Sequence, residues 1–437
     1  MKLSQFNNVV PYNESVVLYN AFSNRYLLVD PLLNDLIESA KAENNIDDLI
    51  GYHPTFYTAL VTNGFIVDNE RDELESVKMM RMKVDMEDES QYHLIINPTM
   101  NCNFKCWYCY EAHEKGSKMS NPTIEHVKKH ISNVVQSMPD IKFFNISWFG
   151  GEPLLYYDQV IVPVMDYVKE FFRDRSCKFS TGFTTNGFLI NEKMIADFPS
   201  FNITNFQITL DGDRETHDAV RFVSSKRGSY DEILANVFAL CRNKMNVSIR
   251  INYTKSNLKN LESILYDFLP LEEDARKYML ISFHKVWQET DVTLTGRIRE
   301  LHRFFRNNGF RATFADMDMP DGLRNSCYAD KKNHATINYN GEVFKCTARN
   351  FSTDAKEGML NEDGSISWSQ KFYDRLDSKF KNKPCLTCPI LPICNGGCSQ
   401  EAIEHKGQDY CMYDFDEQRK KNVVLNKYIN LLQNSVA

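Results

Sequence analysis

Three cysteines lie close together in residues 101–111 and have a spacing that suits metal chemistry. They are Cys102, Cys106 and Cys109, in the pattern CxxxCxxC, with Tyr108 directly before the last one. Three thiolates on one short loop can hold three irons of a cubane cluster and leave the fourth iron open to another ligand. The same spacing alone also fits a structural zinc loop or buried cysteines.

A second motif follows a predicted strand at residues 144–148. It is the run Phe149-Gly150-Gly151-Glu152-Pro153, in which two glycines allow a close backbone approach and Glu152 supplies a carboxylate. The cysteine loop also follows a predicted strand, at residues 94–97. We therefore expect both motifs at the carboxyl ends of parallel strands, which form the catalytic face of barrel enzymes.

This combination resembles the radical S-adenosylmethionine (SAM) superfamily. The resemblance implies that the open iron chelates the methionine part of SAM and that the GGEP motif holds its amino group. The run from Thr209 through Asp211 and His217 to Arg221 resembles the S/T-x-D-G…H-D…R pattern of the peptide- and protein-modifying branch. That resemblance implies that Thr209 and Arg221 hold the carboxylate of SAM. The resemblance implies contacts with SAM from the four residues of the GGEP motif, Gly150, Gly151, Glu152 and Pro153. It also implies contacts from the Thr209 hydroxyl and from Arg221, a ribose contact from Asn252 and an adenine contact from Tyr108. We expect His217 only to cap or pack.

The elements around these motifs alternate between β-rich and helical stretches, which is typical of βαβ units and a parallel sheet. Six strands are too few for a complete eight-stranded barrel. Radical SAM enzymes use a partial barrel of six units, so the resemblance implies an α/β fold with a partial (β/α)6 barrel. The strands are predicted at residues 94–97, 144–148, 178–184, 206–210, 247–252 and 280–283, and the helices at 124–135, 157–172, 230–243 and 258–268.

The last third of the chain contains seven more cysteines among glycine and proline residues. Their spacing resembles the SPASM module, which implies two auxiliary 4Fe–4S clusters and three clusters in all. The family pattern assigns Cys327, Cys346 and Cys398 to the first auxiliary cluster and Cys385, Cys388, Cys394 and Cys411 to the second. Zinc ribbons are the alternative. Because the module has no eighth cysteine, we expect an open or non-cysteine site on the first cluster; Cys177 and Cys241 are expected to pack in the barrel region.

Residues 1–88 predict a small α+β unit with a hairpin, three helices and a closing strand. This order resembles the winged-helix-like peptide-recognition domain of ribosomal-peptide maturases, which implies leader-peptide binding by strand addition. A purely structural winged helix, or one that binds DNA, is the alternative. The net charge of −7 over 437 residues argues against nucleic acid and anionic membrane as partners.

No apolar run in the sequence is long enough for a bilayer, and the first residues lack a signal-peptide core. Twelve cysteines then indicate metal binding in the reducing cytoplasm. The predicted organisation is a peptide-recognition domain with its linker (1–88), a radical SAM partial barrel (89–310) and a SPASM domain (311–437). A final amphipathic helix is expected at about residues 416–432.

The expected function is oxidative modification of a ribosomally made precursor peptide, forming a thioether or carbon–carbon crosslink, with flavodoxin or ferredoxin as electron donor. An anaerobic sulfatase-maturing enzyme is one alternative. Members of that group typically lack the N-terminal unit and carry an aspartate where Thr347 stands here. A metal-stapled, non-catalytic peptide scaffold is the other alternative. No catalytic acid or base stands out; Asp211, His284, Tyr328 and Arg349 are equal candidates.

Overall fold

The computed structural model describes residues 1–224, 226–289, 291, 294–314, 326–405 and 407–435. The chain divides into two compact units. One comprises Met1–Asp88, Asp316–Lys332 and Tyr373–Ala437, and the other comprises Glu89–Ala315 and Asn333–Phe372. The three functional domains predicted from the sequence remain a proposal, since the packing units join segments from more than one of them.

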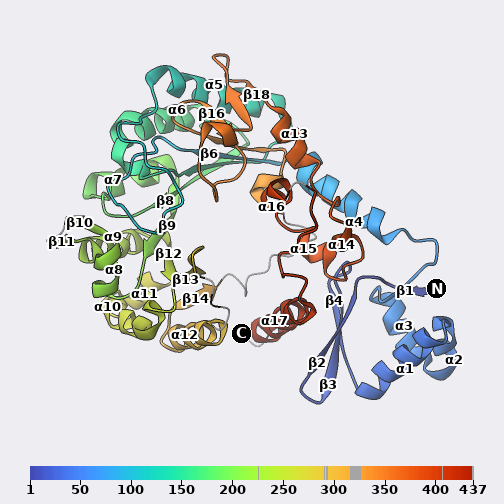
Figure 1. Cartoon of the computed structure of the whole chain (residues 1–437). Coiled ribbons are helices and arrows are strands. Elements are labelled where there is room, and N and C mark those ends of the chain that lie inside the picture. Colours follow the sequence, from blue (N-terminus) through green and yellow to red (C-terminus); the bar gives the residue numbers. More distant parts are fainter. Residues whose placement is uncertain (225, 290, 292–293, 315–325, 406, 436–437) are drawn as a thin grey trace. The chain divides into compact units, whose positions relative to one another are not determined.

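The second unit is built on a sheet of eleven strands with a parallel centre. The six predicted strands are all present and neighbour one another in the order β13-β12-β9-β8-β7-β6 (Figure 1). Their bounds are β6 Gln91–Ile96, β7 Phe143–Trp148, β8 Lys178–Thr185, β9 Ile203–Leu210, β12 Asn246–Tyr253 and β13 Met279–Lys285. All five pairings between them are parallel, so their carboxyl ends share one edge.

Strands that the sequence did not predict extend this sheet at both edges. β14 (Arg311–Phe314) pairs in parallel with β13, and β15 (His334–Ile337) pairs in parallel with β6. Three antiparallel strands then follow β15, namely β16 Glu342–Phe344, β17 Gly358–Leu360 and β18 Ile366–Trp368. A segment assigned to the SPASM region by sequence therefore continues the sheet of the barrel.

Helices cover the outer side of the parallel strands (Figure 1). Helix α5 begins where the Ser120 side chain accepts a hydrogen bond from the Thr123 N–H, and Ile124, Val127 and Ile131 on its inner face are buried. The four predicted helices correspond to α5 Asn121–Ser137, α6 Val162–Phe172, α9 Tyr230–Arg242 and α10 Ile264–Phe268. The predicted helix 157–172 begins as a π-helix over Tyr157–Ile161, and the predicted helix 258–268 begins as a 3-10 helix over Asn257–Ser263. Helix α12, Thr295–Asn307, was not predicted.

The first unit begins with a three-stranded antiparallel sheet in the order β2-β3-β4. The predicted hairpin is formed by β3 (Ser15–Asn20) and β4 (Arg25–Val29), and α1 (Pro31–Ala42), α2 (Leu49–Tyr52) and α3 (Pro54–Thr62) follow. β5 (Ile66–Val67) closes the unit against β1 (Lys2–Leu3). The sequence did not predict β2 (Asn7–Tyr12), whose asparagines and Pro11 weaken the strand pattern.

Both ends of the chain contribute to the core of the first unit. Phe6 and Tyr19 share a buried cluster with Leu391 and with Val424 of helix α17 (Glu417–Ser435). Asn8 Nδ2 donates a hydrogen bond to the Pro389 carbonyl at 3.2 Å. The predicted peptide-recognition segment and part of the predicted cluster segment are therefore packed as one body.

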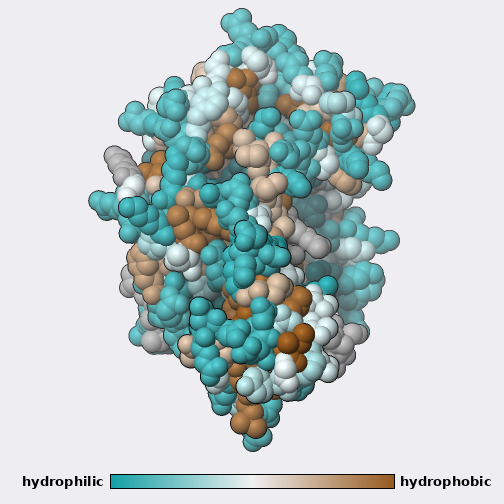
Figure 2. All heavy atoms as spheres, turned by 90° about the vertical axis from the view of Figure 1, so that its right-hand side faces the viewer, coloured by the Kyte–Doolittle hydropathy of each residue, from teal (hydrophilic) through white to brown (hydrophobic). Residues whose placement is uncertain are grey.

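The exposed surface shows scattered apolar groups between hydrophilic side chains on the face that Figure 2 presents. None of the helices in the described part of the chain combines the length and hydrophobicity needed to cross a membrane.

Candidate active site

A pocket that is partly open to solvent lies at the carboxyl ends of the parallel strands. Its walls come from the cysteine loop and from the ends of β7, β8, β9, β12 and β13. The structure brings nine of the predicted cluster and SAM residues together here: Cys102, Cys106, Cys109, Tyr108, Gly150, Gly151, Thr209, Arg221 and Asn252.

The cysteine loop and the glycine pair touch backbone to backbone. A Cβ added at Gly151 would lie 2.2 Å from the Asn101 carbonyl oxygen, and one at Gly150 would lie 2.7 Å from the Asn97 side chain. The Glu152 N–H also donates to the Asn101 carbonyl at 2.9 Å. Only glycine fits this approach, and both glycines have positive φ. The glycines therefore position the thiol loop as well as lining the pocket.

Glu152 is fully buried and does not line the pocket. Its carboxylate accepts hydrogen bonds from the Leu154 N–H at 3.0 Å, the Thr185 hydroxyl at 2.7 Å and the Asn186 N–H at 2.8 Å. Burial raises the pKa of Glu152, while these three bonds stabilise its charged form. The carboxylate thus ties the end of β7 to the end of β8. Pro153 is also buried outside the pocket, so side-chain contacts of either residue with SAM stay a proposal.

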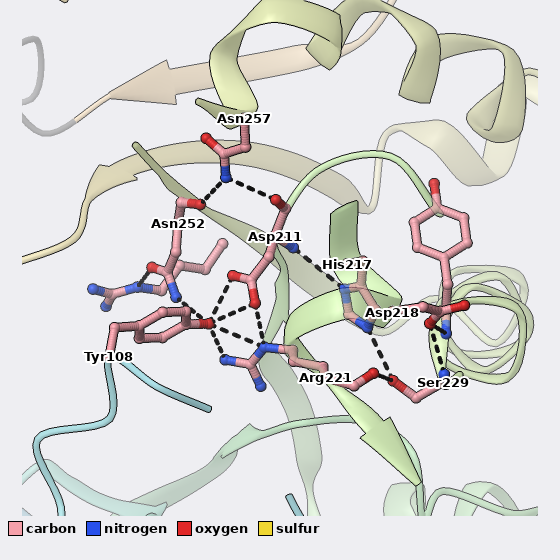
Figure 3. A network of polar contacts seen from close by, with 10 residues as sticks. Tyr108, Asp211, His217, Asp218, Arg221, Ser229, Asn252 and Asn257 are labelled. Atoms are coloured by element: carbon pink, nitrogen blue, oxygen red, sulfur yellow. Dashed lines mark hydrogen bonds and ion pairs between the residues drawn. The ribbon is translucent and has the colours of Figure 1, made fainter. Parts of the chain in front are cut away.

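Tyr108 is held at the pocket by a polar network (Figure 3). Its hydroxyl lies 2.6 Å from Asp211 Oδ2, and it accepts hydrogen bonds from Arg221 Nη2 at 2.7 Å and Asn252 Nδ2 at 3.2 Å. Arg221 Nε also pairs with Asp211 Oδ2 at 2.8 Å, and both side chains are almost fully buried. Asn257 donates to the backbone carbonyls of Asp211 and Asn252. The hydroxyl of Tyr108 thereby connects the cysteine loop to the ends of strands β9 and β12.

His217 packs beneath this network, as expected. The Asp211 N–H donates to His217 Nδ1 at 3.3 Å, and Nε2 lies 3.0 Å from the Ser229 hydroxyl, which donates to the Arg221 carbonyl. An imidazole that accepts at Nδ1 and donates at Nε2 is neutral. Burial, and secondarily the Arg221 charge, lower the pKa of His217 to about 3. His217 therefore orients the segment that carries Arg221.

Glu111 and Arg250 are among the ionisable pocket residues that the sequence did not single out. Glu111 accepts a hydrogen bond from the Gly151 N–H at 2.6 Å, and burial raises its pKa to about 7. Arg250 lines the pocket two residues before Asn252. The period of two along a strand was the available signal for Arg250, because residues 250 and 252 share a face. For Glu111, the only indication in the sequence was its position directly after the cysteine motif.

The three thiols of the loop suit an iron–sulfur cluster. They present soft sulfur donors on one side of an open pocket. Burial raises the pKa of Cys102 to about 12 and that of Cys109 to about 11, so as free thiols they are protonated. No three Cys, His, Asp or Glu side chains of the described residues are gathered as a site for one metal ion.

The four cysteines assigned to the second auxiliary cluster line a separate pocket in the first unit. Lys420 of α17 and Tyr410 belong to the same pocket. Cys327 and Cys398 lie in the first unit and Cys346 in the second, so the grouping of these three stays a prediction. Cys177 and Cys241 are buried, as packing cysteines should be.

Comparison with known proteins supports this picture. The profile of the Radical SAM superfamily matches residues 96–265. The chain contains a radical SAM domain. It begins at the end of β6, immediately before the cysteine loop, and ends within α10. The enzyme class and the radical SAM fold predicted from the sequence are confirmed.

Three relatives indicate the breadth of this similarity. A cysteine-type anaerobic sulfatase-maturating enzyme of Clostridium novyi is 27% identical over 189 residues, which are 41% of this chain and 48% of that enzyme. An Fe-coproporphyrin III synthase of Methanosarcina barkeri is 24% identical over 351 residues, covering 69% and 82% of the two chains. The crystal structure of Streptococcus suis SuiB bound to precursor peptide SuiA has a TM-score of 0.51 at 15% identity, covering 94% and 98%. The matched region thus spans about half of the sulfatase-maturating relative.

Proposed function

We propose that this radical SAM enzyme oxidatively modifies a ribosomally made precursor peptide, closing a thioether or carbon–carbon crosslink. The observation that supports the reaction class most strongly is the pocket where three loop thiols meet the carboxyl ends of the parallel strands. When bound there, a reduced 4Fe–4S cluster and SAM supply a 5′-deoxyadenosyl radical, which removes hydrogen from an unactivated C–H bond.

The chain's own residues bind and orient these groups. Cys102, Cys106 and Cys109 would hold the cluster, and the backbone of Gly150 and Gly151 would face the methionine part of SAM. Tyr108, fixed through its hydroxyl by Asp211 and Arg221, presents an aromatic ring to the pocket, as an adenine contact requires. Thr209 and Asn252 supply a hydroxyl and an amide to the same walls.

Removal of hydrogen leaves one electron to be taken from the substrate before a new bond can close. For a thioether, the S–H and C–H bonds break, a C–S bond forms, and two protons and two electrons leave the peptide. One proton and one electron would leave the peptide together as the hydrogen atom that 5′-deoxyadenosine retains, and the electron for cleavage of SAM would come from the external donor. The second electron would pass to the auxiliary clusters, whose ligands we propose are Cys327, Cys346 and Cys398, and Cys385, Cys388, Cys394 and Cys411. Flavodoxin or ferredoxin would reduce the system in the cytoplasm, where thiols stay reduced.

The edge of β4 supports a peptide substrate. In the described residues, β4 forms backbone ladder bonds to β3 alone, so its other edge can accept an added strand. Leu28 on this strand is 53% exposed and Leu32 at the start of α1 is 76% exposed. An extended leader peptide with apolar residues at alternate positions fits such an edge.

A direct test incubates the reconstituted, reduced enzyme and SAM with short peptides encoded beside its gene. The proposal predicts a peptide product that has lost two hydrogen atoms, with one 5′-deoxyadenosine formed for each product. Conversion of a sulfatase Cys or Ser to formylglycine would instead support the alternative of a sulfatase-maturing enzyme, the class named for the Clostridium novyi relative. A tetrapyrrole product with no peptide product would contradict both.

A further inference from the structure

Arg250 is a charged side chain of the SAM pocket that the expected SAM contacts leave unused. It stands on β12 in register with Thr209 of β9 and Ser282 of β13. Its neighbours along the strand, Ile249 and Ile251, are fully buried on the opposite face. The alternation of a strand therefore directs the guanidinium to the pocket that it lines.

The charge of Arg250 has no acidic partner in contact among the described residues. Its one hydrogen bond there runs from Nε to the neutral amide oxygen of Asn252, at 2.8 Å. Arg221 differs, because it is ion-paired with Asp211 and bonded to Tyr108. Burial lowers the pKa of Arg250, and the Arg221 charge acts in the same direction.

Among the other groups around Arg250, Asp211 favours its charged form but is itself paired with Arg221. His284 is adjacent on β13, and burial together with Arg250 lowers its pKa to about 4, so this imidazole is uncharged near neutral pH. Thr209 and Asn252 are neutral. A partly buried guanidinium without a counter-ion is costly, and its planar pair of Nη groups matches a carboxylate in two-pronged geometry.

We propose that Arg250 binds a carboxylate in this pocket, either that of SAM itself or that of a substrate bound beside it. The inference rests on the proposed function and changes one expected assignment. Arg221, already paired with Asp211, then acts as a positioning residue for Tyr108, and Arg250 supplies the uncompensated positive charge.

The first arm of the test measures binding of SAM and of decarboxylated SAM to the reconstituted holoenzyme by equilibrium dialysis. Variant R250Q is compared with R242Q, whose arginine is exposed and paired with Glu272 on the protein surface. If the partner is the SAM carboxylate, wild type and R242Q prefer SAM at least tenfold, and R250Q binds both compounds equally. Circular dichroism and iron content verify that R250Q is folded and loaded.

The second arm covers a substrate carboxylate. Phenylglyoxal modification of Arg250 is followed by peptide mass mapping, with N-acetylglutamine and N-acetylglutamate as probes, both as their α-amides so that only the glutamate probe carries a carboxylate. Selective protection by N-acetylglutamate, with SAM binding unchanged in R250Q, would assign the carboxylate to the substrate. If R250Q keeps the wild-type preference for SAM, and N-acetylglutamate does not protect Arg250 of the wild type from phenylglyoxal, the role of Arg250 is overturned. A wild-type protein that binds no SAM contradicts the proposed function instead, and the N-acetylglutamate arm still decides for Arg250.

Discussion

At the scale of single residues, the ion pair of Asp211 and Arg221 determines where the Tyr108 ring stands. Sequence alone identified Tyr108 and Arg221 as pocket residues, and the structure places both there. It did not reveal that Asp211 bridges them, because the three residues come from a loop, a strand end and a helix end that only the tertiary fold brings together. Glu152 is a second example. The motif suggested that its carboxylate contacts SAM, but in the structure the carboxylate accepts hydrogen bonds from protein groups instead.

The first prediction concerns Asp211→Asn, which keeps the shape of the side chain and removes its charge. Arg221 then remains buried without a partner, at a cost of about 3–5 kcal/mol in unfolding free energy. We expect SAM affinity to fall at least tenfold because Tyr108 loses its fixed position. Urea titration and equilibrium dialysis measure the two effects. Asp231→Asn, at an exposed pair with Arg214, is the control; equal behaviour of the two variants would contradict the bridging role.

At the scale of elements, the parallel strands were predictable and their extensions were not. Apolar runs such as 144–148 and 247–252 alternate with amphipathic helices, which is a strong local signal. β14, β15 and the short antiparallel strands β16 to β18 contain three or four residues each, so they depend on pairing with a neighbour. β2 is longer, with six residues, and was missed because its asparagines and Pro11 give a weak local preference for which pairing with β3 compensates.

Gly151→Ala tests the contact between two of these elements. The added Cβ would meet the Asn101 carbonyl at 2.2 Å, so the glycine strand end must move away from the cysteine loop. We expect a several-fold loss of iron from the site of Cys102, Cys106 and Cys109. Iron content and optical absorption after reconstitution measure this loss. Gly116→Ala is matched for positive φ but has no atom within 4 Å of the new Cβ. It should keep its iron; equal losses in both variants would attribute the effect to backbone strain alone.

At the scale of the whole molecule, the shared core of the first unit was beyond sequence analysis. Nothing local marks Val424 as a partner of Phe6 or Tyr19, which lie about four hundred residues away in the chain. Val424→Ala should destabilise the protein by about 1–3 kcal/mol through the cavity it leaves. Hydrogen exchange at residues 7–20 should also accelerate. Leu431→Ala on the exposed side of α17 is the control, and unchanged exchange in the Val424 variant would argue against the common core.

Buried neutral histidines predict how the stability of the whole chain depends on pH. Burial lowers the pKa of His130 and His284 to about 4 and of His217 to about 3, below the unfolded value near 6.5. The unfolded chain therefore binds more protons as the pH falls below about 6.5. Each histidine then removes about 1.4 kcal/mol per pH unit, until its folded pKa is reached. Urea titrations between pH 7 and pH 5 should show this decline, and His130→Gln should reduce its slope; an unchanged slope would mean that His130 is not buried neutral.

The central claim is that Cys102, Cys106 and Cys109 form a redox site for SAM. Its most direct test is formation of 5′-deoxyadenosine by the anaerobically reconstituted, dithionite-reduced protein, followed by liquid chromatography and mass spectrometry. We predict formation that depends on SAM and reductant and disappears in Cys102→Ala, Cys106→Ala and Cys109→Ala, while Cys177→Ala keeps it. Reconstituted protein with full iron content that leaves SAM intact, or triple loss of these cysteines without effect, would contradict the account.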